Sequence, residues 1–127
     1  MARLTGFSAT ELAADREGIA LRYAKAWNAV VVLKGARTVV ASPDGRVCVN
    51  PTGNPGLSRG GSGDVLAGLI AAFAAQGLSS WDAACAGVYL HGLAGDCAAA
   101  ALSQQAMLPR DLLAYLPQVL AKLEQER

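Results

Sequence analysis

The sequence is poor in the residues that hold metal centres and disulfide frameworks. It contains one histidine, His91, and three widely spaced cysteines, Cys48, Cys85 and Cys97, in 127 residues. An odd number of cysteines without paired spacing predicts neither a zinc site nor a secreted disulfide scaffold. We therefore expect reduced, buried thiols and a cytoplasmic protein.

The sequence also lacks the patterns of nucleic-acid and membrane proteins. Its 11 basic and 10 acidic side chains give a net charge of +1 and form no dense basic block, whereas binding to a phosphate backbone depends on clustered lysine and arginine. No continuous apolar run reaches the roughly 20 residues that span a bilayer, and no signal-peptide core follows Met1. We expect neither nucleic acid nor a membrane among the partners.

The residues that are abundant suit an α/β protein. Hydrophobic residues make up 53% of the chain and charged residues 17%, which is enough for a core, and we expect one domain over residues 1–127. Alanines concentrate in residues 71–75 and 98–101, where small side chains let helices pack closely on a sheet. This pattern favours layers of helices and strands.

Local patterns in the first half predict a helix, a strand and a hairpin. Ser8 and Glu11 form a capping box, and apolar residues at helical spacing extend the predicted helix over residues 9–27. The apolar, mostly β-branched residues 29–33 are typical of a strand covered on both faces, as in a parallel sheet. Residues 38–41 and 46–49 flank a Ser-Pro-Asp-Gly turn, which predicts a β-hairpin.

The second half predicts a glycine-rich loop followed by three helices. Residues 50–63 carry two prolines and five glycines, too many for regular structure. Helices are expected over residues 64–75, from Ser79 or Ser80 to residue 102, and from about Pro109 onward. A few strands and about four helices are fewer elements than a doubly wound sheet contains, so the sequence predicts only part of a three-layer α/β fold.

The glycine-rich loop ends in residues suited to an anion. The segment Gly60, Gly61, Ser62 and Gly63 stands directly before the predicted helix that begins at Asp64. Glycines let a ligand approach the backbone, and the N–H groups and dipole of a helix N-terminus attract phosphate. No Lys-Ser or Lys-Thr pair follows, so this anion loop resembles a P-loop in principle only.

Asp64 permits two interpretations. A carboxylate in a first helical turn is favoured by the helix dipole and needs no functional reason. Alternatively, Asp64 is a general base that removes the proton from a substrate hydroxyl as its oxygen attacks a phosphoryl group. The second interpretation makes this aspartate the chemical centre of the chain.

Four other polar residues also allow a structural or a functional interpretation. Lys34 at the end of an apolar strand and Arg59 beside the anion loop either contact a nucleotide or extend into solvent. His91, on an apolar helix, is interpreted as a packed, hydrogen-bonded core residue. Asp96 follows it by five positions, a spacing that does not bring two side chains onto one helix face, so the two do not form a dyad.

Four sequence blocks in one order carry a family resemblance. They read Val-Val-Leu-Lys-Gly-Ala-Arg-Thr at residues 31–38, Asn-Pro-Thr-Gly-Asn-Pro-Gly at 50–56, Gly-Gly-Ser-Gly-Asp-Val-Leu-Ala-Gly at 60–68 and Gly-Val-Tyr-Leu-His-Gly-Leu-Ala-Gly-Asp at 87–96. Together they resemble the NAD(P)H-hydrate dehydratases of the ribokinase-like superfamily. The resemblance implies a ribokinase-like three-layer α/β fold, of which this chain is the C-terminal portion.

The resemblance also implies a reaction and its residues. Family members phosphorylate the hydroxyl of hydrated NADH or NADPH from ADP or ATP and then eliminate phosphate, which repairs the dinucleotide. By motif match, Gly63 lies beside the nucleotide phosphates, and Asp64 and Asn54 lie at the substrate. The nucleotide is contacted by Lys34, Gly35, Ala36, Arg37 and Thr38. Mg²⁺ accompanies the nucleotide, although no carboxylate cluster in the sequence identifies protein ligands for it.

The sequence departs from the family pattern at its beginning. Family members are considerably longer, and a His-Pro-Gly-Glu segment that helps to bind the hydrate precedes the stretch that resembles residues 1–6. We therefore expect a C-terminal portion of the family domain with an exposed sheet edge and an exposed apolar face. Such a chain should form a homo-oligomer or associate with a missing N-terminal half.

Two other functions are compatible with the sequence. One is a small-molecule kinase of the same superfamily, acting on a vitamin precursor or sugar with Asp64 again as base. Those kinases usually lack the run found at residues 50–56. The other is a non-catalytic nucleotide-binding remnant, which the absence of the His-Pro-Gly-Glu segment supports.

Overall fold

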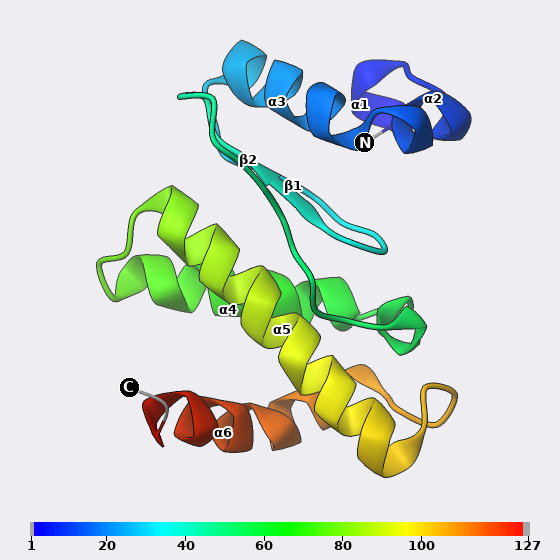
Figure 1. Cartoon of the computed structure of the whole chain (residues 1–127), viewed down its shortest axis with the longest axis vertical. Coiled ribbons are helices and arrows are strands. Elements are labelled where there is room, and N and C mark those ends of the chain that lie inside the picture. The colour runs from blue at the N-terminus through cyan, green and yellow to red at the C-terminus, as the bar shows by residue number, and fades with distance from the viewer. Residues whose placement is uncertain (1, 126–127) are drawn as a thin grey trace. The chain divides into compact units, whose positions relative to one another are not determined.

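The chain divides into two units, Met1–Asn50 and Pro51–Arg127, and the computed structural model describes its residues 2–125. The first unit contains helices α1 (Ala2–Thr5), α2 (Ala9–Ala14) and α3 (Arg16–Trp27) and strands β1 (Val31–Leu33), β2 (Val39–Ala41) and β3 (Val47–Val49) (Figure 1). The second contains the 3₁₀ helix η1 (Pro55–Leu57) and helices α4 (Ser62–Ala75), α5 (Ser80–Leu102) and α6 (Pro109–Gln125).

The single helix predicted over residues 9–27 is wrong, because Asp15 divides it into α2 and α3. Asp15 has φ −147° and ψ 65°, and its carboxylate accepts a hydrogen bond from the Gly18 N–H at 3.1 Å, so it caps α3. An aspartate that bonds nearby backbone in this way competes with continuous helix. The predicted capping box at the start of α2 is confirmed: the Glu11 N–H donates to the Ser8 hydroxyl, and the Ser8 N–H donates to the Glu11 carboxylate.

The sheet of the first unit is antiparallel, in the order β1-β2-β3. Val32 lies opposite Val40, and Val40 opposite Cys48. The predicted hairpin is confirmed by the Ser42 N–H, which donates to the Arg46 carbonyl at 2.8 Å. The expectation of a parallel setting for β1 is wrong, because a short connection to β2 allows only antiparallel pairing. Small residues of α3 pack on this sheet, and the shared cluster comprises Ala20, Ala24, Val31, Val39 and Ala41.

The second unit is helical, with α5 packed against both α4 and α6. The predicted starts of α5 and α6 are confirmed, and the Ser79 hydroxyl caps α5 by accepting from the Asp82 N–H at 3.1 Å. The predicted loop over residues 50–63 contains η1, and α4 begins at Ser62, two residues before the predicted start. The buried core of this unit comprises Leu90, Ala94, Ala98, Met107, Leu112, Leu116 and Val119.

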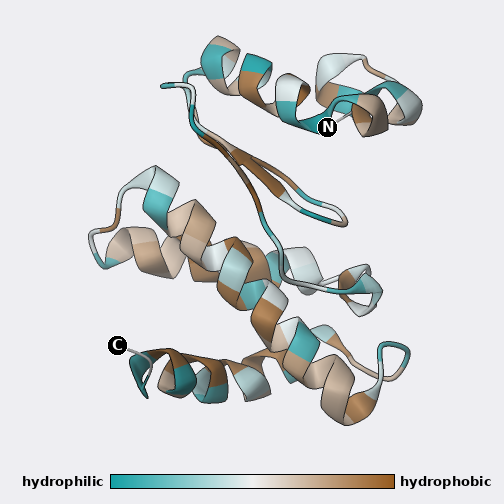
Figure 2. Cartoon of the chain, in the orientation of Figure 1, coloured by the Kyte–Doolittle hydropathy of each residue, from teal (hydrophilic) through white to brown (hydrophobic). Residues whose placement is uncertain are grey.

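Helix α5 is the core helix of its unit. Its 23 residues include ten buried ones, and hydrophobic colours run along much of its length as they do along the strands (Figure 2). By length and composition alone α5 is long and apolar enough to cross a membrane, although the sequence contains no continuous apolar run of that length. A helix buried in a protein core can have the same length and composition. The three cysteines are half-buried thiols rather than buried ones as expected.

Candidate functional site

The anion loop leads into α4 through a glycine in a left-handed conformation. Gly61 occupies the N-cap position with φ 95°, a region that side chains other than glycine rarely adopt. It makes no side-chain capping bond, so an external acceptor meets no competing side chain at this helix end. Ser62 and Gly63, predicted to lie in the loop, already belong to the first turn. Asp64 follows in the same turn with its side chain exposed.

A buried histidine of α5 fixes this first turn from behind. The His91 ring Nε2 lies 3.0 Å from the Ser62 carbonyl oxygen and 3.2 Å from its hydroxyl oxygen. Because a carbonyl can only accept, Nε2 carries the proton. His91 and Ser62 are both buried. The interpretation of His91 as a hydrogen-bonded core residue is therefore confirmed, and its partner is a residue of the anion loop, which no spacing in the sequence indicated.

The loop before η1 is held by Asp96, for which no role was predicted. One Asp96 carboxylate oxygen accepts from the Gly53 N–H at 3.1 Å, and the other accepts from the Asn54 side-chain amide at 3.0 Å. The Asn54 side-chain oxygen in turn accepts from the Gly56 N–H at 2.9 Å. Asn54, predicted to lie at the substrate, therefore uses its oxygen and one amide donor to shape its own loop.

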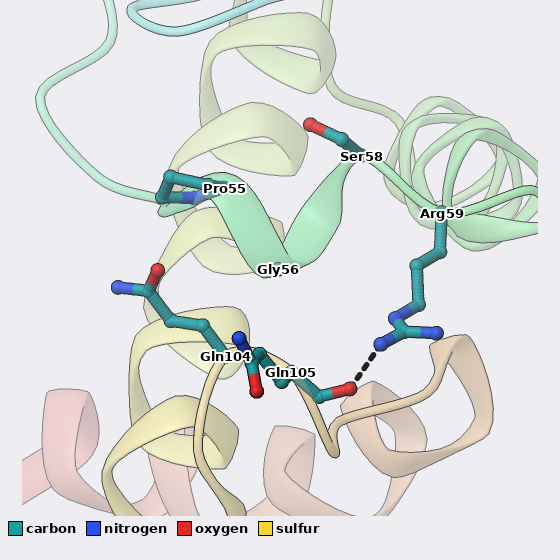
Figure 3. A pocket seen from close by; sticks show the side chains of 6 residues that line it. All are labelled: Pro55, Gly56, Ser58, Arg59, Gln104 and Gln105. Carbon is teal, nitrogen blue, oxygen red and sulfur yellow. Dashed lines mark hydrogen bonds between the residues drawn. The ribbon is translucent and has the colours of Figure 1, made fainter.

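A shallow hollow of about 310 Å³ lies beside this loop. It is lined by Pro55, Gly56, Ser58, Arg59, Gln104 and Gln105 (Figure 3). The Arg59 guanidinium donates to the main-chain carbonyl of Gln105, so this arginine joins the anion loop to the α5–α6 connection. The sequence predicted that Arg59 either contacts a phosphate or extends into solvent. In the structure its guanidinium also bonds to the main chain of Gln105.

The residues predicted to contact the nucleotide lie in the first unit, in the connection between β1 and β2. Lys34, Gly35, Ala36 and Arg37 are exposed and Thr38 is half-buried. The anion loop belongs to the second unit. The predicted nucleotide contacts and the anion loop are therefore each formed by residues that are consecutive in the sequence. Sequence inspection missed Arg16, whose side chain contacts the β1–β2 connection.

A metal site made by protein side chains is not found in the described part of the chain. Across residues 2–125, no three His, Cys, Asp or Glu side chains are grouped so that they could hold an ion. Magnesium in proteins is commonly held by one or two carboxylates together with substrate phosphates.

Comparison with known proteins places these features in a family. The sequence profile of the NAD(P)H-hydrate dehydratases matches residues 1–118. A bifunctional NAD(P)H-hydrate repair enzyme of Moorella thermoacetica is 57% identical over 126 residues, covering 99% of this chain and 24% of that protein. An ADP-dependent (S)-NAD(P)H-hydrate dehydratase of Xanthomonas campestris is 42% identical, with 97% of this chain and 43% of that protein covered.

Solved structures agree with the sequence relatives. An ADP/ATP-dependent NAD(P)H-hydrate dehydratase of Bacillus subtilis, co-crystallised with ATP/Mg²⁺, superposes with a TM-score of 0.91 at 36% identity, covering 95% of this chain and 44% of that one. A ribokinase-like superfamily protein of Enterococcus faecalis gives a TM-score of 0.75 at 34% identity, covering 95% of this chain and 40% of that one. The predicted ribokinase-like α/β fold is thereby confirmed. The chain spans less than half the length of each of these relatives, and over residues 1–118 it belongs to the NAD(P)H-hydrate dehydratase family.

Proposed function

We propose that the chain forms the phosphoryl-transfer part of an ADP- or ATP-dependent NAD(P)H-hydrate dehydratase. The observation that carries this proposal is the first turn of α4. An N-cap glycine without a side-chain capping bond opens that helix end to phosphate, and the exposed Asp64 carboxylate follows within the same turn. Phosphorylation of a hydroxyl requires a binding site for the phosphates of the donor and a group that accepts the hydroxyl proton.

The proposed reaction begins with attack by the hydroxyl oxygen of the hydrated nicotinamide ring on the terminal phosphorus of ADP or ATP. Asp64 accepts the hydroxyl proton, and the bond from phosphorus to the leaving nucleotide breaks, releasing AMP or ADP. N–H groups at the start of α4 stabilise the charge on the transferred group. The carbon–oxygen bond then breaks, phosphate leaves, and loss of a proton from the adjacent ring carbon restores the double bond.

Magnesium is proposed to arrive with the nucleotide. The Bacillus subtilis relative was co-crystallised with ATP/Mg²⁺. Phosphate oxygens and water would supply most of its ligands, as is usual for this ion. Lys34, Gly35, Ala36, Arg37 and Thr38 are proposed to contact the nucleotide, and Asn54 to lie near the hydrate.

Titration of the purified chain with ADP and Mg²⁺ by calorimetry tests the proposal. We expect saturable binding that is lost in Gly63→Val, because a branched side chain in the first turn of α4 would occupy the space of the phosphate. Circular dichroism of the variant checks that it is folded. Binding that survives Gly63→Val would remove the anion loop from the site.

Phosphorylation of a vitamin precursor or sugar, without loss of hydrate absorbance, would favour the small-molecule kinase instead. Nucleotide binding without turnover would favour a non-catalytic remnant.

We also propose that the chain is cytoplasmic, that its two units belong to one domain, and that it acts in an assembly. The assembly would be a homo-oligomer or a complex with a polypeptide carrying the other segments of the family domain. The relatives are more than twice as long, and Leu113 and Leu120 on α6 are 58% and 43% exposed. Light scattering should show a dimer or larger species. A monodisperse monomer that unfolds cooperatively would argue against the assembly.

A further inference from the structure

Arg16, the first residue of α3, donates hydrogen bonds to the end of β1 and to the β1–β2 connection. Its Nη1 donates to the carbonyls of Ala36 at 2.7 Å and Arg37 at 3.0 Å. Its Nη2 donates to the carbonyls of Leu33 at 2.8 Å and Lys34 at 3.0 Å. One guanidinium therefore holds four main-chain carbonyls, none of them closer than 17 positions in the sequence.

The remaining carbonyl of this segment is also bonded. The Thr38 hydroxyl donates to the Gly35 carbonyl at 3.3 Å, so each carbonyl from residue 33 to residue 37 accepts a bond from a side chain. A Cβ added at Gly35 would lie 2.9 Å from the Arg16 Nη2. The motif match predicted a nucleotide contact at Gly35, and the space left by this glycine faces the guanidinium.

These contacts determine the conformation of the segment. Arg37 has φ 61°, which a residue with a side chain adopts only at an energetic cost. Hydrogen bonds from a charged donor are stronger than neutral ones, and the planar guanidinium fixes several acceptors in one geometry. A lysine at position 16 would keep the charge but could not reproduce four bonds in a plane.

The bonds also change what the segment offers to a ligand. Free carbonyl oxygens would repel a phosphate, but here four of the five are directed to the Arg16 guanidinium. The exposed side chains of Lys34 and Arg37 add two further positive charges. We infer that Arg16 is a positioning residue that holds residues 33–37 in the form that binds an adenine nucleotide, without touching the nucleotide itself. This inference rests on the proposed nucleotide-binding role of the segment.

The substitution Arg16→Lys tests the inference, with Arg46→Lys as the matched control. Arg46 lies in the same unit and pairs with Asp44 at 2.8 Å. Its hydrogen bonds hold the pKa of the Asp44 carboxyl below its usual value, but this pair is exposed and lies in the turn after β2, whereas residues 33–37 precede that strand. Two quantities are measured for each variant: amide hydrogen exchange of residues 33–38 without nucleotide, and the Kd of ADP with Mg²⁺ by calorimetry.

We expect faster exchange at residues 33–38 in Arg16→Lys and no change in Arg46→Lys. If the binding conformation falls to about a tenth of the molecules, the Kd of ADP rises about tenfold. In an active assembly the KM for ADP should rise in the same proportion while kcat changes little. Added guanidinium ion, well below unfolding concentrations, should restore part of the affinity of Arg16→Ala. A thermal melt of each variant establishes that it is folded.

An Arg16→Lys variant that binds ADP as tightly as the unchanged chain would overturn the inference. Equal loss of affinity in Arg46→Lys would also overturn it, because the effect would then be one of general stability. Failure of the unchanged chain to bind ADP would instead overturn the proposed function, and the inference with it. The two failures are distinguishable because one is seen in the unchanged chain and the other only in the variant.

Discussion

In an active assembly, Asp64→Asn is expected to lower the rate of hydrate dehydration by about 10²- to 10⁴-fold, the usual contribution of a general base, while the Kd of ADP changes little. Asparagine has nearly the same shape but cannot accept the hydroxyl proton. The exposed side chain makes the exchange compatible with the fold. Loss of hydrate absorbance with ADP and Mg²⁺ gives the rate, and calorimetry gives the affinity.

Asp82→Asn is the matched control for this experiment. Asp82 is the third residue of α5, just as Asp64 is the third residue of α4, and both are the acidic residues of their first turns. Each carboxylate is favoured by its helix dipole to a similar extent, about 0.3–1 kcal/mol. If Asp64 only interacted favourably with its helix dipole, Asp64→Asn and Asp82→Asn would have similar effects on rate and stability. A difference in rate with similar stabilities would identify Asp64 as the base, and near-normal turnover of Asp64→Asn would exclude it.

The parts of the fold that could be predicted from sequence are those fixed by neighbouring residues. The Ser8 cap, the Ser79 cap and the turn after Ser42 each depend on bonds that span three or four positions. Such bonds repeat from protein to protein because the backbone geometry fixes them, so the residue pattern alone indicates them. The change from loop to helix near residues 60–64 was also indicated by neighbouring residues, although α4 begins at Ser62, inside the predicted loop.

The parts that escaped prediction depend on contacts between distant residues. Arg16 meets carbonyls at least 17 positions away, and Asp96 meets Gly53 across 43 positions. Nothing in the spacing of these residues distinguishes them from solvated charges. The break at Asp15 was missed for a different reason: apolar periodicity continues across it, and only the competing side-chain bond ends α2. The family resemblance placed Asn54 at the substrate but could not show that Asp96 holds it.

The largest stability effect is expected for Gly92→Ala, in the middle of α5. A Cβ at this position would lie 2.7 Å from the main-chain carbonyl carbon of Thr52. Thr52 cannot move alone, because its hydroxyl donates to the Tyr89 carbonyl at 2.9 Å and the next residues are bonded to Asp96. The loop would have to leave α5. Overpacking of this kind costs about 1–3 kcal/mol, which exceeds the gain in helix propensity of up to about 1 kcal/mol.

Gly68→Ala in α4 distinguishes the cost of overpacking from the gain in helix propensity. Apart from the neighbouring residues and the local helix backbone, no heavy atom of the described residues lies within 4 Å of a Cβ added at Gly68. This exchange should therefore raise the free energy of unfolding by about 0.5–1 kcal/mol. Urea unfolding followed by far-ultraviolet circular dichroism measures both variants. Asp96→Ala should act in the same direction as Gly92→Ala, since it removes the acceptor for the Gly53 and Asn54 N–H groups. If Gly92→Ala were as stable as Gly68→Ala, the loop would not be docked on α5, and its part in shaping the site would be lost.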